Sequence, residues 1–301
     1  MRRLALVISV ALFAVIALRW LKAEPDGPAR GPATRPSLAL AQDVEPSNCT
    51  QPGAWAQIAQ SNAASLGALA WPLSGKDQLG WEIYEPLVRR ELASPCPAYS
   101  PGFAVALARW QAGHGLPANG RMDAVSFETM WIAMLRRRPF VQAMRFGCPA
   151  PLPASELDVA RPDEAFGRQT TIMARRDALA AYRTMLAAAR AEVPAIRDDP
   201  QALTIVSAFR APQADGSDCP AGHACFNLTR ASCSAHRTGL AFDLYLGAAS
   251  GRDPTSTADE NRLYQSRTLA YRWLVSHAAQ FGFLPYAYEP WHWEWTPPPP
   301  G

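Results

Sequence analysis

Histidines and acidic residues occur together at two places in the C-terminal half of this chain. The sequence SAHRTGLAFD contains His236 and Asp243, and the sequence YEPWHWEW contains His292 between Glu289 and Glu294. Imidazole and carboxylate groups are the protein ligands of hydrolytic zinc sites, and a carboxylate can also take a proton from water. The chain has only five histidines, so these two stretches are the first candidates for chemistry.

The residues after His236 predict a strand entered through a turn. From Leu240 onward apolar side chains recur with a period of two, which predicts a half-buried strand with Asp243 facing away from the leucine side. A straight chain would hold His236 about 20 Å from Asp243, so the two can share a ligand only if the chain turns back. Gly239 permits such a turn. For this pair alone, a strand-edge aspartate and an unrelated surface histidine are the simpler interpretation.

The stretch around His292 also has a purely structural interpretation. Trp291, Trp293 and Trp295 alternate and can form one apolar face of a strand. His292 and Glu294 then share the other face.

The N-terminus is typical of an exported protein. Arg2 and Arg3 precede an uncharged apolar run, so residues 1–22 are expected to be a signal peptide or a membrane anchor. The run is short for a spanning helix, and no small-residue cleavage site follows directly, so both alternatives stay open. Residues 23–48 are rich in Pro and Ala and predict a linker.

Export changes the interpretation of the cysteines. In an oxidising compartment, six cysteines predict up to three disulfides, whose pairing the sequence leaves open. A structural zinc site is the weaker alternative for one cluster of residues. That cluster comprises Cys219, His223, Cys225 and Cys233.

The remaining sequence predicts an α+β fold in two domains. Residues 49–140 are expected to be helical, with Phe103, Leu107 and Trp110 on one apolar helix face and Ser126 as the N-cap of a second helix. Residues 141–301 predict a small antiparallel sheet with flanking helices. Their expected elements are a helix from Thr171 to about Glu192, a strand ending at Arg210, and a helix from a Thr257–Glu260 capping box to about Gln280.

About forty residues of the helical region resemble the three-helix peptidoglycan-binding domain. The matching features, in order, are Trp110-Gln111, Gly115-Leu116, Asn119-Gly120 and Ser126. The resemblance implies that residues 49–140 bind the wall polymer.

The two histidine stretches together resemble the zinc D-Ala-D-Ala carboxypeptidases of the VanY type and their hedgehog-fold relatives. The family motif Ser-x-His-x-x-Gly-x-Ala-x-Asp is filled by Ser234, His236, Gly239, Ala241 and Asp243. The second motif, Glu-x-x-His, is filled by Glu289 to His292. The order of the motifs, and the single helix expected between them, also agree with the family.

The resemblance implies a role for each matching residue. His236, Asp243 and His292 would bind Zn²⁺ and leave a position for water, whose pKa the metal lowers. Glu289 would be the catalytic base. Arg210 would stabilise the oxyanion or hold the peptide carboxylate, and Ser234 would lie at the substrate.

The sequence departs from the family beside Arg210, where Phe209 replaces a tyrosine, and in the long cysteine-bearing insertion before Ser234. The alternative for Arg210 is an exposed residue at a strand end.

The strand pattern and the family motif favour different residues as the catalytic base: the pattern favours Glu294 and the motif favours Glu289. In a regular strand Glu294 shares a face with His292, whereas Glu289 lies on the opposite face. Pro290 restricts the residue before it and lacks an N–H, so we expect the strand to begin only after Pro290. Glu289 then belongs to the preceding turn, and Glu294 would orient His292 through its second ring nitrogen.

The resulting expectation is an exported zinc metallopeptidase of the periplasm or cell envelope that acts on peptidoglycan stem peptides. Removal of a terminal D-Ala is the leading activity. The alternatives are an L,D-carboxypeptidase, a stem endopeptidase, or a non-catalytic wall-binding protein that keeps the metal for structure. A net charge of +3, with no basic stripe interleaved with aromatic residues, argues against a nucleic-acid partner.

Overall fold

The computed structural model describes residues 49–50, 53–73, 76–146, 149–150, 152–211 and 234–297. They all belong to one unit, Glu45–Gly301. The expected signal or anchor, the linker and the Cys219–Cys233 cluster lie outside the described residues. Among the described residues, no helix has the length and apolar character needed to cross a membrane.

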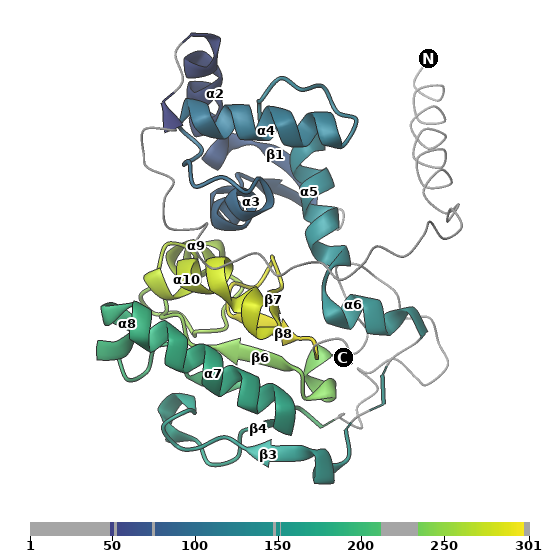
Figure 1. Ribbon diagram of the computed structural model, residues 1–301, viewed down its shortest axis with the longest axis vertical. Helices are drawn as coiled ribbons and strands as arrows, with labels where there is room; N and C mark the ends of the chain where they lie inside the picture. The colour runs from purple at the N-terminus through teal and green to yellow at the C-terminus, as the bar shows by residue number, and fades with distance from the viewer. Residues whose placement is uncertain are drawn as a thin grey trace. The chain divides into compact units, whose positions relative to one another are not determined.

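The first part of the described chain is mainly helical, as expected, but it also contains a β-hairpin (Figure 1). Its helices are α2 (Ala54–Ala68), η3 (Glu82–Tyr84), α3 (Glu85–Glu91), α4 (Pro101–Gly113), α5 (Ala124–Arg136), α6 (Pro139–Ala143) and η4 (Met144–Phe146). The hairpin pairs β1 (Ala70–Leu73) with β2 (Lys76–Leu79) in antiparallel register. A disulfide joins Cys49 to Cys96.

The polar side chains of the helical region fix where α5 begins. The N-cap of α5 is Asp123, whose Oδ1 accepts a hydrogen bond from Ser126 N at 2.8 Å. Ser126 therefore lies inside the first turn, and its expected role as the cap is wrong. Its hydroxyl instead accepts a hydrogen bond from buried Gln111 at 3.0 Å, and Gln111 also accepts from Gly120 N at 2.8 Å. The Gln111 amide thus ties the end of α4 to the start of α5.

The second part is α+β, as expected. Its helices are η5 (Ala154–Glu156), η6 (Phe166–Arg168), α7 (Arg176–Glu192), α8 (Pro194–Asp198), η7 (Ala235–Thr238), α9 (Asp259–Ser266), α10 (Leu269–His277) and η8 (Ala278–Phe281). Its strands are β3 (Leu157–Val159), β4 (Met173–Arg175), β5 (Ile205–Ser207), β6 (Ala241–Leu244), β7 (Phe283–Pro285) and β8 (His292–Trp295). β3 and β4 form a separate antiparallel pair.

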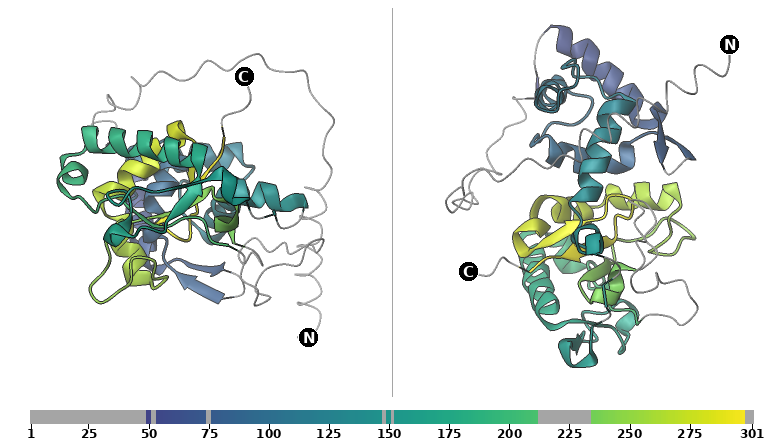
Figure 2. Two further views of the ribbon diagram at one scale, coloured as in Figure 1. Left: turned by 90° about the horizontal axis from the view of Figure 1, so that it is seen from below. Right: turned by 90° about the vertical axis from the view of Figure 1, so that its right-hand side faces the viewer.

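The main sheet is antiparallel and has the strand order β5-β6-β8-β7. Phe242 on β6 is paired with Trp293 on β8, so both side chains point to the same face. Phe242 stacks on Tyr182 of α7 at 5.7 Å between ring centroids, and Trp293 meets Tyr271 of α10 at 6.3 Å. Figures 1 and 2 show α7 running along the sheet. This face is the apolar core.

The opposite face of the sheet carries the polar residues. Asp243 is paired with His292, and Ala241 with Glu294. All four residues of β6 are buried, so the expected half-buried strand is wrong because this second face is covered as well. Ala241 packs in a small apolar cluster with Phe140 and Met144 of the α6 region. The acids and histidines therefore lie under protein and not on an open surface.

Three expected element boundaries differ from those observed. The helix expected from Thr171 begins at Arg176, because Met173–Arg175 forms β4. The strand expected to end at Arg210 ends at Ser207. The helix expected up to Gln280 is broken at residues 267–268, where Thr268 caps α10, and α9 has no side-chain cap from Thr257.

Candidate metal centre

His236 is carried by the short helix η7 at the entry to β6. The hydroxyl of Ser234 accepts a hydrogen bond from His236 N at 3.3 Å and caps the helix. Gly239 ends η7 at φ +65°, and a Cβ there would approach Leu152 Cδ1 to 2.9 Å, so glycine fits this turn best. The chain reverses here, which brings His236 back over Asp243, 3.2 Å from Nε2 to Oδ2.

Asp243 and His292 meet across the sheet. Asp243 Oδ1 lies 2.9 Å from His292 Nδ1, and the His236 and His292 rings are 5.0 Å apart, nearly perpendicular. Each of the three residues offers one ligand atom within 4.8 Å of the others, and all three are buried. This group can hold a metal ion.

The hydrogen bonds of the two imidazoles indicate which nitrogen each would offer. His236 Nδ1 is 2.6 Å from the carbonyl oxygen of Ala208, so Nδ1 carries the proton and Nε2 is left toward Asp243. His292 Nε2 is 3.2 Å from Glu294 Oε1, which leaves Nδ1 toward Asp243. In protein metal sites a ligating histidine usually donates its other N–H to a carbonyl or carboxylate. The donor set and its supporting contacts therefore fit a divalent metal of the zinc type.

Glu294 is held in place by residues that precede the sheet in sequence. Its Oε1 accepts a hydrogen bond from Arg138 Nε at 2.9 Å, and its Oε2 accepts one from Phe140 N at 2.9 Å. The Glu294 carboxylate thus lies between His292 and the start of α6, and only 1% of the residue is exposed. Arg138 had no expected role, because nothing in its local sequence relates it to a residue more than 150 positions away.

Arg210 lies at the edge of the metal centre. Its Nη2 donates to Asp243 Oδ2 at 2.6 Å, and its Nε donates to Ser207 Oγ at 2.9 Å. About half of its side chain is exposed. Arg210 therefore combines contact with a candidate ligand and access to solvent, whereas Ser234 has a capping role in the structure.

Glu289 lies in the loop between β7 and β8. β8 begins at His292, after Pro290. A turn holds the loop, because Glu289 O accepts a hydrogen bond from His292 N at 2.9 Å. No hydrogen bond to the Glu289 carboxylate is found among the described residues. The carboxylate is half-buried, and this burial raises its pKa, as does the nearby charge of Asp243.

Burial and neighbouring charges also shift the pKa values of His236, His292 and Glu294. Burial lowers the pKa of His236. Burial also opposes the charged form of His292. The hydrogen bonds of His292 to Asp243 and Glu294 outweigh this effect and raise its pKa to about 9. The pKa of Glu294 falls to about 2 despite burial, because Arg138 and His292 face it. The metal-free centre therefore holds a proton on His292 at neutral pH.

The remaining described histidines have structural contacts. His114 stacks on Trp110 at 3.9 Å, and His277 stacks on Trp273 at 5.0 Å. Each also places Nδ1 within 2.9 Å of the carbonyl of its stacking partner. His223 lies outside the described residues.

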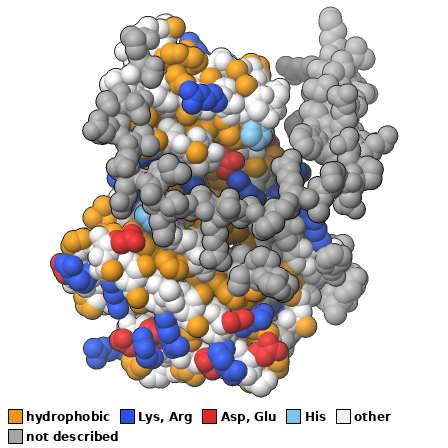
Figure 3. Space-filling model, viewed as in Figure 1, with side chains coloured by type: hydrophobic (Ala, Val, Ile, Leu, Met, Phe, Trp, Pro, Cys, Tyr) orange, Lys and Arg blue, Asp and Glu red, His pale blue; other side chains and the backbone are white. Residues whose placement is uncertain are grey.

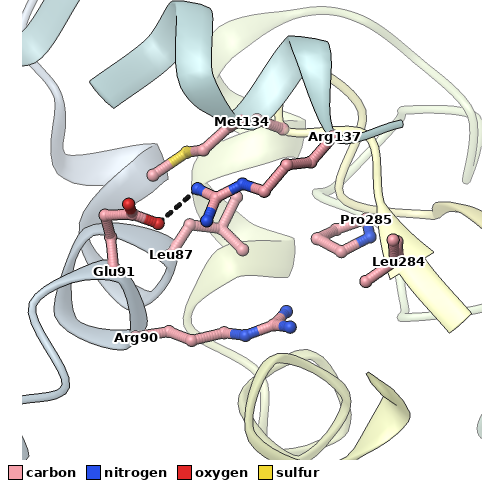
Figure 4. A pocket seen from close by; sticks show the side chains of 8 residues that line it. Leu87, Arg90, Glu91, Met134, Arg137, Leu284 and Pro285 are labelled. Carbon is pink, nitrogen blue, oxygen red and sulfur yellow. Dashed lines mark hydrogen bonds and ion pairs between the residues drawn. The ribbon is translucent and has the colours of Figure 1, made fainter. Parts of the chain in front are cut away.

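A cavity of about 210 Å³ lies apart from the metal ligands (Figure 4). It is lined by Leu87, Arg90, Glu91, Met134, Arg137, Leu284, Pro285 and Ala287. Arg137 forms an ion pair with Glu91 there.

On the face of the molecule drawn in Figure 3, acidic and basic side chains are intermixed.

Comparison of the chain with protein-family models, with curated proteins and with solved structures finds no match. The candidate function therefore rests on the motifs and on the geometry of the centre.

Proposed function

We propose that this protein is an exported zinc metallopeptidase that hydrolyses peptidoglycan stem peptides, with removal of the terminal D-Ala as its main activity. The observation that carries the proposal is the buried group His236, Asp243 and His292, whose ligand atoms lie within 4.8 Å of one another. These are the positions that the two family motifs assign to the metal. The substrate class rests on the resemblance of those motifs.

A zinc ion held by two histidines and one carboxylate lowers the pKa of water toward neutrality. Glu289 would take the proton of the attacking water and later give it to the leaving amine. Its raised pKa suits this exchange, because an effective general base titrates closer to the working pH than an ordinary glutamate. Its carboxylate, free of other hydrogen bonds among the described residues, can serve this role.

Arg210 would contact the substrate at the edge of the metal centre. Its guanidinium is fixed by Ser207 and Asp243, yet half of the side chain remains open to solvent. A cation held in this way can stabilise the negative charge that develops on the carbonyl oxygen, or pair with the C-terminal carboxylate of the stem peptide. A role for Arg210 in substrate binding is therefore part of the proposal.

The proposal also includes the wall as a partner. The helical region would hold the enzyme on the wall polymer, and the Cys49–Cys96 disulfide agrees with an oxidising, exported location.

Digestion of purified muropeptides, followed by mass analysis, tests the function. Products lighter by one alanine support D-Ala removal. Cleavage within the stem would replace it with an endopeptidase or L,D-carboxypeptidase activity. Zinc-loaded protein that leaves every muropeptide intact would overturn the catalytic proposal in favour of a wall-binding protein.

A further inference from the structure

We infer that Arg138, supplied by the helical region, is a positioning residue for the metal ligand His292. The inference rests on the metal site of the proposed function, but it concerns a residue outside both motifs. Arg138 reaches His292 through one intermediate, the carboxylate of Glu294.

The contacts form a continuous buried chain. Arg138 Nε donates to Glu294 Oε1 at 2.9 Å, and its Nη2 contacts the same oxygen. That oxygen lies 3.2 Å from His292 Nε2. The Arg138 side chain is 10% exposed and the Glu294 side chain 2%, so water screens this ion pair little. If the Glu294 carboxylate turned away from His292, it would leave the buried guanidinium of Arg138 without its counter-ion.

The backbone at the start of α6 explains why Arg138 points into the centre. Arg138 precedes Pro139, and a residue before proline is driven out of the helical region. Arg138 accordingly has φ −59° and ψ 129°, which separates α5 from α6. Pro139 has no N–H, so Phe140 N is the first donor of α6 able to reach Glu294, and it binds Oε2 at 2.9 Å.

A second contact of Arg138 acts on the same ligand. The guanidinium lies over the Tyr286 ring, 3.7 Å from its centroid. Tyr286 in turn meets the His292 ring edge to face at 5.9 Å, and Tyr286 N donates to His292 O at 3.0 Å. Arg138 therefore supports His292 both through its ring nitrogen and through its aromatic neighbour.

These contacts give the helical region a role in the metal centre beyond wall binding. Two partners of Glu294 come from this region: Arg138 lies between α5 and α6, and Phe140 lies in the first turn of α6. Hydrogen-bond partners of metal ligands typically change metal affinity by about 10- to 100-fold when they are removed. The affinity of the centre for zinc should then depend on a residue that neither binds zinc nor touches substrate.

The test measures the zinc dissociation constant of the full chain by competition with a chelator. Arg138→Met should weaken zinc binding by about 10- to 100-fold, because the Glu294 carboxylate loses its cation. Arg138→Lys, which keeps the charge but not the planar group over Tyr286 and Glu294, should fall between Arg138→Met and the wild type. The neighbouring variant Arg137→Met is the matched control. Arg137 has an exposed side chain that pairs with Glu91 outside the centre, and its removal should leave zinc affinity within about threefold.

Thermal unfolding of the metal-free variants separates positioning from general stability. A purely structural Arg138 would lower the unfolding temperature and leave the zinc dissociation constant of the folded protein unchanged, which would overturn the inference. An equal loss of zinc affinity in Arg137→Met would overturn it too.

If Arg138→Met does not fold, the pair Arg138→Lys and Glu294→Gln replaces it. Their losses of zinc affinity should be less than additive in the double variant, because both act through one contact. Additive losses would contradict the inference. If the wild type binds zinc but cleaves no muropeptide, the proposed function fails, while a loss of zinc affinity in Arg138→Lys still supports the role of Arg138.

Discussion

His292 and Asp243 are register partners on adjacent antiparallel strands, with His292 Nδ1 2.9 Å from Asp243 Oδ1. Paired residues of a sheet point to the same face, so the sheet itself fixes the spacing of these two candidate ligands. Of the three residues, only His236 lies outside the sheet, on the short helix η7, which ends at the Gly239 turn. A centre assembled in this way is largely pre-formed for a metal ion.

The first prediction concerns metal content. His236→Ala and His292→Ala should each weaken zinc binding by more than about 100-fold, since a lost ligand costs more than a lost partner of a ligand. Zinc per chain, measured by elemental analysis after dialysis, checks this. The control is His277→Ala, because His277 stacks on Trp273 away from the centre. Full zinc content in either ligand variant would contradict the site as described.

The second prediction concerns pH. His292 carries a proton below its raised pKa of about 9, and zinc must displace that proton to bind. The apparent zinc affinity should therefore rise by about tenfold per pH unit from neutral pH toward pH 9, and then level off. His236 adds little to this slope because its pKa is lowered, so it is already neutral at pH 7.

Calorimetry of zinc binding in buffers of different ionisation heat measures the same linkage directly. About one proton should leave the protein per zinc bound at pH 7. An affinity independent of pH between 7 and 9 would show that His292 is neutral in the metal-free protein.

The third prediction concerns the disulfide. Cys49 and Cys96 close a loop with a sequence separation of 47, and loop entropy assigns such a bond about 4 kcal/mol of stability. Cys49→Ala and Cys96→Ala should each lower the free energy of unfolding by about 2–4 kcal/mol. The double variant should be little worse than either single one, because both remove the same bond. Fully additive losses in denaturant unfolding would argue against the bond.

The sequence predicts the turns beside the candidate ligands well, since Gly239 and Pro290 specify them locally. The glycine turn and the start of β8 after proline follow from backbone restrictions on those residues alone. The hairpin β1–β2 was not expected, although the Ser-Gly pair between its strands is a sequence signal for a tight turn.

Contacts between segments far apart in the chain could not be predicted from the sequence. Arg138 and Glu294 meet where Phe140 of α6 packs with Ala241 of β6, and no spacing rule relates residues on separate elements. Arg262 is a similar case. It is buried and donates to Tyr84 Oη at 2.8 Å and to Tyr288 O at 3.1 Å, which joins the helical region to the loop that carries Glu289. The helical region is therefore linked to the surroundings of the centre through Arg138, which pairs with Glu294, and through Tyr84, which binds Arg262.

The last prediction separates the two acids near His292. Glu294 is held by Arg138 and Phe140, and its charge is committed to these partners and to His292. Glu289 has no such partners among the described residues and lies on a loop beside the ligands. Glu289→Gln should keep zinc affinity yet lower kcat by about 10²- to 10⁴-fold, the scale of a lost general base. Glu294→Gln should weaken zinc binding but, at saturating zinc, cost much less in kcat. Muropeptide hydrolysis measured over a range of zinc concentrations distinguishes the two effects. The reverse order of kcat losses, with zinc bound in both variants, would move the role of the base to Glu294.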